Sequence, residues 1–286
     1  MARLWKGAPV AAALSERVAA QVERLKQRGV SPALAIVRVG QRPEDLSYER
    51  GALKRCEMVG ITIKQFILPD TVELTELLHI VEAINQDAAI HGCLLFRPLP
   101  RHLDEAAVCA ALAPSKDVDG ITAGSLAGVF AGSGSGFPPC TAQACLEILD
   151  YYGYELTGKR AVVVGRSLVI GKPAAMLLLQ RNATVTLCHT RTDDLAAECR
   201  RADVLIAAAG KAGMLGVSHI APGQAVIDVG INLDADGMLV GDVDFAAAEP
   251  VADAVTPVPG GVGAVTTSVL ARHVAEAAAR LYGLGG

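Results

Sequence analysis

The first part of the chain alternates between helical and strand-like hydrophobic patterns. From Val10 to Arg28 apolar residues recur every three or four positions, which predicts an amphipathic helix ended by Gly29. Residues 33–39 form a short run rich in β-branched side chains, which predicts a strand. The alternation continues with helices at 48–59 and 71–87 and strands at 61–68 and 91–96. Strands that alternate with helices predict a parallel sheet with helices on both faces.

A second strand–helix series follows a loop-rich segment. Residues 120–138 contain six glycines and predict a loop region within which a domain boundary lies. The predicted elements after it are helices at 141–152 and 267–281 and strands at 160–164, 184–187, 203–207 and 225–229. The glycine-rich turn 259–263 comes before the last helix.

Composition excludes several classes of protein. The chain has 286 residues, of which 51% are hydrophobic and 20% charged, so it is too apolar to be disordered and long enough for two domains. Its net charge of −4 leaves no electrostatic footprint for nucleic acid. We expect no membrane span and no signal peptide, because no long uncharged apolar run occurs. The seven scattered cysteines and six scattered histidines predict free thiols in a cytoplasmic protein without a metal site.

The strongest local pattern lies between Val162 and Pro173. A predicted strand meets Gly165, followed by Arg166, Ser167 and a second glycine, Gly171, in the spacing G-x-S-x-x-x-G. Glycines at such a turn let the backbone approach a pyrophosphate, and the free N–H groups of the helix that Pro173 opens favour its negative charge. The pattern predicts nucleotide binding. A glycine turn that only packs is the alternative, because the spacing is not G-x-G-x-x-G.

The residues after the next strand bear on the choice of nucleotide. NAD sites often have an acidic residue there, whereas this chain has Thr190 and Arg191, with Arg166 in the first turn. Cations and hydroxyl groups suit a 2′-phosphate, so NADP is favoured over NAD. The alternative is that Arg191 is solvated, with its charge partly offset by Asp193 and Asp194.

Taken with the nucleotide turn, four further stretches resemble the methylenetetrahydrofolate dehydrogenase/cyclohydrolase family. They are Lys116-Asp-Val-Asp-Gly120, Pro139-Cys-Thr141, Gly241-Asp-Val-Asp-Phe245 and Thr256-Pro-Val-Pro-Gly-Gly-Val-Gly263. The resemblance implies a two-domain α/β homodimer with a folate cleft between an N-terminal domain and a Rossmann-like nucleotide domain. It assigns residues 1–120 and 267–286 to the first domain and 140–266 to the second. Members oxidise methylenetetrahydrofolate with NAD(P), and most then hydrolyse the methenyl product.

Two departures from the family pattern bear on the hydrolysis. The family carries Y-x-x-x-K on a first-domain helix, where the lysine does cyclohydrolase chemistry; here Tyr48 matches but Ala52 holds the lysine position. Lys54 is the nearest lysine, and it lies about 200° around the helix from position 52, which predicts a solvated side chain. The family glutamine that supports the lysine is replaced by Phe96, and Arg97 should point to the opposite face of the strand.

These departures predict a dehydrogenase with weak or absent cyclohydrolase activity. Direct hydride transfer needs positioning but no obligatory acid or base, whereas hydrolysis needs a positioned proton donor or acceptor. A cell using such an enzyme would need a separate cyclohydrolase. The alternatives are a bifunctional enzyme with a surrogate acid/base, and a non-catalytic folate- or nucleotide-binding relative.

The resemblance also implies roles for the remaining site residues. Tyr48 would stack on the pterin and Asp119 would accept from its amino edge, and these two are the catalytic candidates; Asp117 is predicted to be structural. Pro259, Gly260 and Gly261 would lie against the folate, and Gly210 and Ile231 against the cofactor, in addition to Gly165, Arg166, Ser167, Gly171, Pro173, Thr190 and Arg191. Cys140 is interpreted as a packing residue, because no histidine is near it in the sequence.

Overall fold

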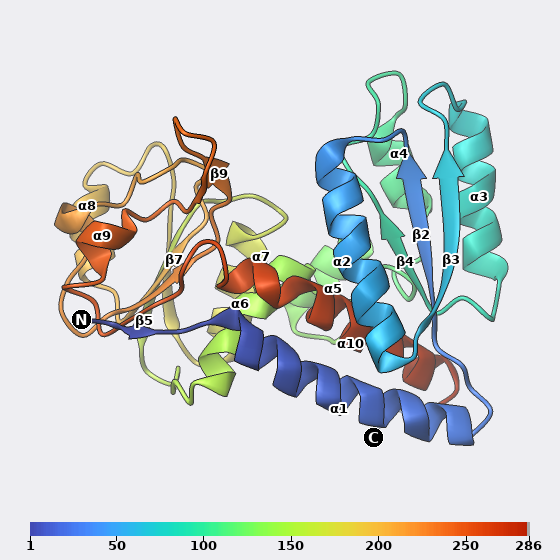
Figure 1. Ribbon diagram of the computed structural model, residues 1–286, viewed down its shortest axis with the longest axis horizontal. Coiled ribbons are helices and arrows are strands. Elements are labelled where there is room, and N and C mark those ends of the chain that lie inside the picture. Colours follow the sequence, from blue (N-terminus) through green and yellow to red (C-terminus); the bar gives the residue numbers. More distant parts are fainter. Residues whose placement is uncertain (285–286) are drawn as a thin grey trace. The chain divides into compact units, whose positions relative to one another are not determined.

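A computed structural model describes residues 1–284 and divides the chain into two compact units. Unit 1 contains residues 1–12 and 141–266, and unit 2 contains residues 13–140 and those from 267 onward (Figure 1). Each unit has a parallel sheet covered by helices, which confirms the predicted two-domain α/β fold. None of the helices within residues 1–284 has the length and apolar character needed to cross a membrane.

Unit 2 is built on the three-stranded parallel sheet β3-β2-β4. Its strands are β2 (Ala33–Val39), β3 (Thr62–Leu68) and β4 (Gly92–Leu95). Its helices are most of α1 (Gly7–Gln27), α2 (Pro43–Val59), α3 (Leu74–Gln86), α4 (Glu105–Ala111), α5 (Ala123–Ala131) and most of α10 (Thr266–Leu281). Figure 1 shows β2, β3 and β4 side by side, with α2 and α3 next to them.

The central strand β2 is buried on both faces. Its odd-numbered residues Ala35 and Val37 belong to one apolar cluster with Leu77 and Val81 of α3. On the opposite face Arg38 Nε donates to Glu49 Oε2 of α2 at 2.8 Å. The alternation of strand side chains therefore places α3 and α2 on opposite faces of this sheet.

Two helices of unit 2 differ from the predicted elements. Helix α2 begins five residues before the predicted start at Tyr48, because Pro43 occupies a first-turn position that needs no N–H donor. Helix α5 lies inside the segment predicted as loop. Two of its glycines serve close packing, since a Cβ on Gly128 would lie 1.9 Å from the carbonyl oxygen of Ser135 and one on Gly124 2.5 Å from Pro114.

Unit 1 is built on the six-stranded parallel sheet β1-β11-β8-β7-β5-β6. The strands are β1 (Arg3–Leu4), β5 (Arg160–Val164), β6 (Thr184–Cys188), β7 (Val204–Ala207), β8 (Ala225–Asp228) and β11 (Ala254–Val255), with a separate hairpin of β9 (Asn232–Leu233) and β10 (Leu239–Val240). The helices are α6 (Cys140–Tyr151), α7 (Gly171–Gln180), α8 (Leu195–Arg200), α9 (Phe245–Ala248) and the 3₁₀ turns η1 (Val217–His219) and η2 (Val262–Ala264).

The first twelve residues lie in unit 1, which differs from the predicted assignment of 1–120 to the first domain. Arg3 and Leu4 pair with Ala254 and Val255 as an edge strand of the six-stranded sheet. The Trp5 ring also stacks on Tyr152 with centroids 5.1 Å apart. A two-residue strand has no periodicity, so only the tertiary contacts reveal it. The boundary also falls at residue 140, just beyond the predicted segment 120–138.

Candidate functional site

The nucleotide turn opens into a cavity of about 290 Å³ in unit 1. The cavity lies where β5, β6 and β7 end, which is the usual ligand position in an open parallel sheet. Its wall contains Gly165, Arg166, Ser167 and Thr190, four of the residues predicted to bind the cofactor. The remaining lining residues are Val164, His189, Leu195, Ala208, Ala209, Lys211 and Met214.

Both glycines of the turn are required by the closeness of the backbone. Gly165 has φ +124°, and a Cβ there would lie 2.0 Å from the carbonyl oxygen of Ala208. A Cβ on Gly171 would lie 2.0 Å from the carbonyl oxygen of Gly165. The Ser167 hydroxyl accepts from the backbone N–H of Ile170 at 3.1 Å and orders the start of α7. The turn thus holds strand, loop and helix N-terminus close together, as a pyrophosphate cradle needs.

The cationic residues in the loops after β5, β6 and β7 differ in position relative to the cavity. Arg166 is exposed and lines the cavity with Thr190, whereas Arg191 is exposed and is not part of its wall. The backbone N–H of Arg191 donates to His189 Nδ1 at 3.0 Å and fixes this loop. Lys211, which sequence reasoning missed, also lines the cavity. The sequence marks Lys211 only weakly, because a single lysine next to Gly210 matches no binding motif.

A buried carboxylate shapes the loop that carries Lys211. Asp242 Oδ2 accepts from the backbone N–H groups of Ala209 and Gly210 at 2.6 and 2.9 Å, and its Oδ1 accepts from that of Lys211 at 2.8 Å. Its Oδ1 also accepts from Asn232 Nδ2 at 2.9 Å. Gly210, predicted as a cofactor residue, is therefore part of a loop anchored by Asp242, and it does not itself line the cavity.

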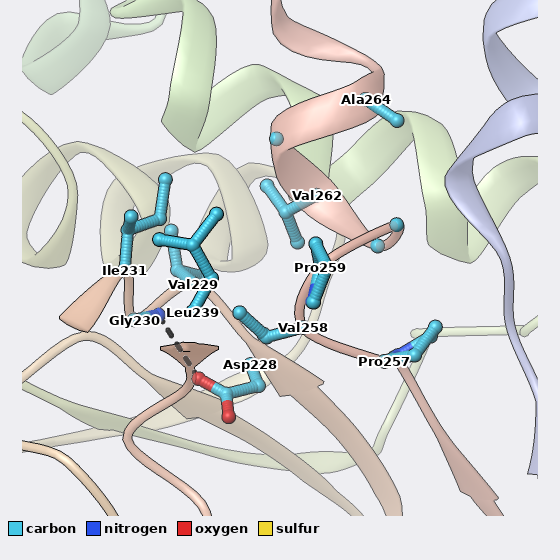
Figure 2. A pocket seen from close by; sticks show the side chains of 13 residues that line it. Asp228, Val229, Gly230, Ile231, Leu239, Pro257, Val258, Pro259, Val262 and Ala264 are labelled. Carbon is cyan, nitrogen blue, oxygen red and sulfur yellow. Dashed lines mark hydrogen bonds between the residues drawn. The ribbon is translucent and has the colours of Figure 1, made fainter. Parts of the chain in front are cut away.

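A second cavity of unit 1, of about 300 Å³, contains the glycine-rich turn 259–263. It brings together Ile231 with Pro259, Gly260 and Gly261, residues predicted to bind cofactor and folate. Figure 2 shows Val229, Ile231 and Leu239 on one wall and Pro259 and Val262 on the other. The floor is fixed by Asp228, whose Oδ1 accepts from the backbone N–H of Gly230 at 2.9 Å (Figure 2).

Unit 2 brings Tyr48 and Phe96 together. The Tyr48 ring meets the Phe96 ring edge to face, with centroids 6.0 Å apart. Ala52 lies one helical turn beyond Tyr48 on the same face of α2 and is buried. Lys54 is exposed. Arg97 forms an ion pair with Glu105 at 3.5 Å. The side chains at positions 52 and 96 therefore offer neither a proton nor a hydrogen bond.

Asp119 is a partly buried carboxylic acid in the same unit. Burial raises its pKa to about 6, although hydrogen bonds from Cys140 and the charge of Arg97 oppose the rise. The neighbouring Asp117 is fully buried and accepts from the backbone N–H groups of Ile121 and Thr122 at 3.0 and 2.7 Å. Asp117 therefore fixes the turn, whereas Asp119 is the partly exposed carboxyl group of this segment.

We expect folate affinity to depend on the ionisation of Asp119. Ionised Asp119 accepts hydrogen bonds from an amino edge, and protonation below its pKa of about 6 removes part of that capacity. The value of kcat/KM for the folate should fall as the pH drops through about 6. Its pH profile should lose this limb in the Asp119→Asn variant; the same limb in that variant would exclude Asp119 as its source.

The surroundings of Cys140 correct one sequence-based argument. A histidine does lie near it, since His273 of α10 places Nδ1 3.8 Å from Cys140 Sγ. Both side chains are buried, and burial lowers the pKa of His273 to about 3 and raises that of the thiol well above its usual value. A buried thiol that stays protonated is no nucleophile. The packing role stands for this physical reason.

All seven cysteines are free in the structure. Six of them are buried and Cys109 is partly buried. Within residues 1–284 no group of three or more His, Cys, Asp or Glu side chains is arranged to hold a metal ion.

Comparison with known families matches both halves of the chain. Residues 5–119 match the tetrahydrofolate dehydrogenase/cyclohydrolase catalytic domain, and residues 139–282 match the NAD(P)-binding domain of the same family. The chain is 51% identical over 286 residues to the bifunctional protein FolD of Carboxydothermus hydrogenoformans, covering 99% of this chain and 100% of that protein.

Two solved structures share the fold at high similarity. One is the bifunctional enzyme FolD, methylenetetrahydrofolate dehydrogenase/cyclohydrolase, from Campylobacter jejuni, with 35% identity and a TM-score of 0.94 over 98% of this chain and 99% of that one. The other is the Trypanosoma brucei dehydrogenase-cyclohydrolase complexed with NADP and an inhibitor, with 34% identity and a TM-score of 0.90 over 98% of each chain.

Proposed function

Because the chain belongs to the tetrahydrofolate dehydrogenase/cyclohydrolase family, we propose that it oxidises 5,10-methylenetetrahydrofolate to the methenyl form by hydride transfer to NADP. The observation that carries the proposal is the cavity at Gly165, beside a turn so close-packed that a Cβ on Gly165 or Gly171 would lie 2.0 Å from a backbone carbonyl oxygen. The substrate nitrogens stabilise the cation left by hydride loss. The protein therefore has to position two carbons and needs no obligatory acid or base.

The cavity wall supports NADP over NAD. Arg166, Lys211 and Thr190 offer two cations and a hydroxyl group, and the wall residues of this cavity within 1–284 include no carboxylate. Such a lining suits a 2′-phosphate. The Trypanosoma brucei relative is complexed with NADP. The bound cofactor would accept the hydride, with its phosphates held by the Gly165 turn and the start of α7.

We expect Arg166 to matter more than Arg191 for the choice of cofactor, because only Arg166 lines the cavity. Arg166→Ser should raise the KM for NADP by about tenfold, as expected for loss of one charge-assisted hydrogen bond, and change that for NAD little. Arg191→Ser is the matched control and should change the KM for NADP less than Arg166→Ser does. The reverse order would place the 2′-phosphate at the loop after β6.

Tyr48 and Asp119 are proposed to hold the folate in unit 2. The edge-to-face contact with Phe96 fixes the Tyr48 ring at 6.0 Å between centroids, so the ring has a defined orientation for stacking. In unit 1 the turn at Pro259, Gly260 and Gly261 supplies an apolar wall with exposed backbone. These five residues are the proposed folate contacts, and the pH profile of Asp119 tests the one made by a carboxyl group.

The names of the relatives favour a second activity. The Carboxydothermus hydrogenoformans and Campylobacter jejuni proteins are called bifunctional, and the second is named a dehydrogenase/cyclohydrolase. This supports cyclohydrolase activity more than its absence and argues against the need for a separate cyclohydrolase. The buried Ala52 and Phe96 provide no acid or base, however. We therefore propose that this chain performs the hydrolysis slowly, with a surrogate group or solvent in place of a positioned base.

The double variant Ala52→Lys with Phe96→Gln is expected to raise the rate of methenyl hydrolysis by ~10²-fold, the lower range for a positioned acid or base. The reason is that Ala52 lies one turn from Tyr48, where an amine would enter the same face of α2. The rate is followed by the loss of methenyl absorbance. Leu53→Lys with Phe96→Gln is the control, because position 53 points to another helix face. An equal rise in both double variants would show that a lysine at position 52 has no specific role in the hydrolysis.

Product analysis tests the proposed function as a whole. The chain is incubated with methylenetetrahydrofolate and NADP, and the methenyl and formyl products are resolved against an enzyme-free sample. Methenyl product that accumulates before enzyme-dependent formyl product is the expected result. A formyl product that appears without a methenyl lag would show efficient hydrolysis despite Ala52 and Phe96. The absence of both products with NADP and with NAD would overturn the dehydrogenase.

We also propose that the chain is a homodimer. The support is the family resemblance and the apolar side chains on the hairpin β9–β10, where Leu233 and Met238 are about two-thirds exposed at 67% and 64%. Sedimentation of the purified chain should give twice the monomer mass of 29.6 kDa. A monomer at micromolar concentration would contradict the proposal.

A further inference from the structure

Unit 2 contains a cavity that the proposed reaction does not use. It measures about 290 Å³, and its wall includes His91, Lys116, Phe137, Arg280 and Leu281. His91 comes just before β4 and Phe96 just after it, so the two residues lie about 16 Å apart at the usual rise of a strand. The cavity is thus at the opposite end of the strand from Tyr48 and Phe96.

His91 presents an unsatisfied hydrogen-bond donor. Its side chain is 4% exposed, and Nδ1 accepts from the backbone N–H of Ala33 at 3.1 Å. Burial and the nearby charge of Lys116 lower the pKa of His91, which keeps the ring neutral. The single proton of the neutral ring therefore sits on Nε2, and Nε2 is buried without a hydrogen-bond partner. Buried polar atoms nearly always form a hydrogen bond, so we expect this N–H group to donate to an acceptor supplied by a ligand.

The charge of the wall is positive. Lys116 Nζ donates to the carbonyl oxygens of Ile84, Asp87 and Ile90 at 2.8, 2.6 and 2.8 Å, so its donors are used but its charge remains. Arg280 Nη1 donates to the carbonyl oxygens of Gly134 and Gly136 at 3.1 and 2.9 Å. No carboxylate belongs to the wall of this cavity among residues 1–284. The nearest acidic partner of Arg280 is Glu276, at 3.8 Å on the same helix.

The other part of the wall is apolar. The Arg280 guanidinium lies 4.3 Å from the centre of the Phe137 ring, and Leu281 and Ala277 continue this face. The Phe137 ring packs against the ring of His273, with centroids 4.9 Å apart. A lone inorganic ion would fill only a small part of about 290 Å³. The shape therefore suits a ligand with an anionic end and an apolar body.

We propose that this cavity binds a small organic carboxylate, whose anionic end accepts from His91 Nε2 and pairs with Arg280 while its apolar body lies against Phe137 and Leu281. The ligand meets three needs of the site at once. It satisfies the buried donor, neutralises the positive wall and fills the apolar space. The site is independent of the proposed dehydrogenase activity, because its wall contains neither Tyr48, Phe96 nor Asp119 and no residue of unit 1.

Calorimetric titration of the full chain with benzoate tests the proposal, with benzamide as the uncharged probe of the same shape. Wild type should bind benzoate at least about tenfold more tightly than benzamide, the usual gain of a charge-assisted hydrogen bond. His91→Phe and Arg280→Met should each weaken benzoate binding by about tenfold. Two exposed residues provide matched controls, and His79→Phe and Arg28→Met should leave the affinity unchanged.

The location is read independently from the ¹⁵N resonance of His91 Nε2, which should shift when benzoate is added. Because His91→Phe also removes the acceptor of the Ala33 N–H, Arg280→Met is the variant that decides if the first one does not fold. Equal affinity for benzoate and benzamide, unchanged affinity in Arg280→Met, or no binding of benzoate by wild type would each overturn the proposal. Binding of inorganic phosphate in place of benzoate, lost in Arg280→Met, would overturn the organic part of it.

Discussion

Replacing Gly165 with alanine is expected to lower kcat/KM for NADP on the order of 10²-fold or more. The new Cβ would lie 2.0 Å from the carbonyl oxygen of Ala208, and the residue has φ +124°, which side chains rarely adopt. Strain of this kind costs ~1–3 kcal/mol even before the clash is counted, so the turn must move. A displaced turn no longer cradles the pyrophosphate. Initial rates at varied NADP and fluorescence titration of NADP measure the loss.

Gly216→Ala provides the matched control for this change in the same unit. Nothing lies within 4 Å of a Cβ at position 216, and its φ of −89° suits any residue. This variant should bind NADP as wild type does. Thermal unfolding should show Gly165→Ala still folded at the assay temperature, which separates a lost site from a lost fold. NADP affinity within twofold of wild type in Gly165→Ala would remove the turn from the cofactor site.

The parts of the fold that could be predicted from sequence are those specified by local residues. Strands β2 and β5 have the predicted bounds, because each is a buried β-branched run that continuous apolar patterning reveals. Helix α5 could not be predicted, since local propensity penalises glycine, whereas Gly128 is needed for close approach of the Ser135 backbone and Gly124 for that of the Pro114 ring. The strand β1 depends on pairing with residues about 250 positions away, which no local pattern encodes.

The residues of the candidate site also fall into those that local motifs reveal and those that only contacts between distant residues reveal. The glycine turn and the residues Ala52 and Phe96 are visible in short motifs; the turn borders a cavity, and Ala52 lies one helical turn from Tyr48, which contacts Phe96. Lys211 could not be found from a motif, because its position depends on hydrogen bonds from a loop to Asp242, about thirty residues later. The nearness of His273 to Cys140 was missed for a similar reason, since α10 returns to unit 2 after the whole of unit 1.

The buried carboxylate of Asp242 should therefore control both stability and cofactor affinity. Its two oxygens accept from three backbone N–H groups of the loop 209–211 and from Asn232 Nδ2. In Asp242→Asn one oxygen becomes an N–H donor that faces other donors, and their partners are lost. Unsatisfied buried groups of this kind cost ~1–3 kcal/mol each, so we expect the free energy of unfolding to fall by about 3 kcal/mol. The KM for NADP should rise about tenfold, because Ala209 and Lys211 line the cavity.

The control is the exposed Asp244, two residues after Asp242 in the segment between β10 and α9. It caps α9 by accepting from the backbone N–H of Ala247, and asparagine caps a helix about as well as aspartate. Asp244→Asn should therefore change neither the denaturation midpoint nor the KM for NADP measurably. Asp242→Asn should lower stability and NADP affinity only if the Asp242 hydrogen bonds hold the loop 209–211 in place. Equal urea midpoints and equal KM values for the two variants would show that the loop 209–211 keeps its form without the Asp242 carboxylate.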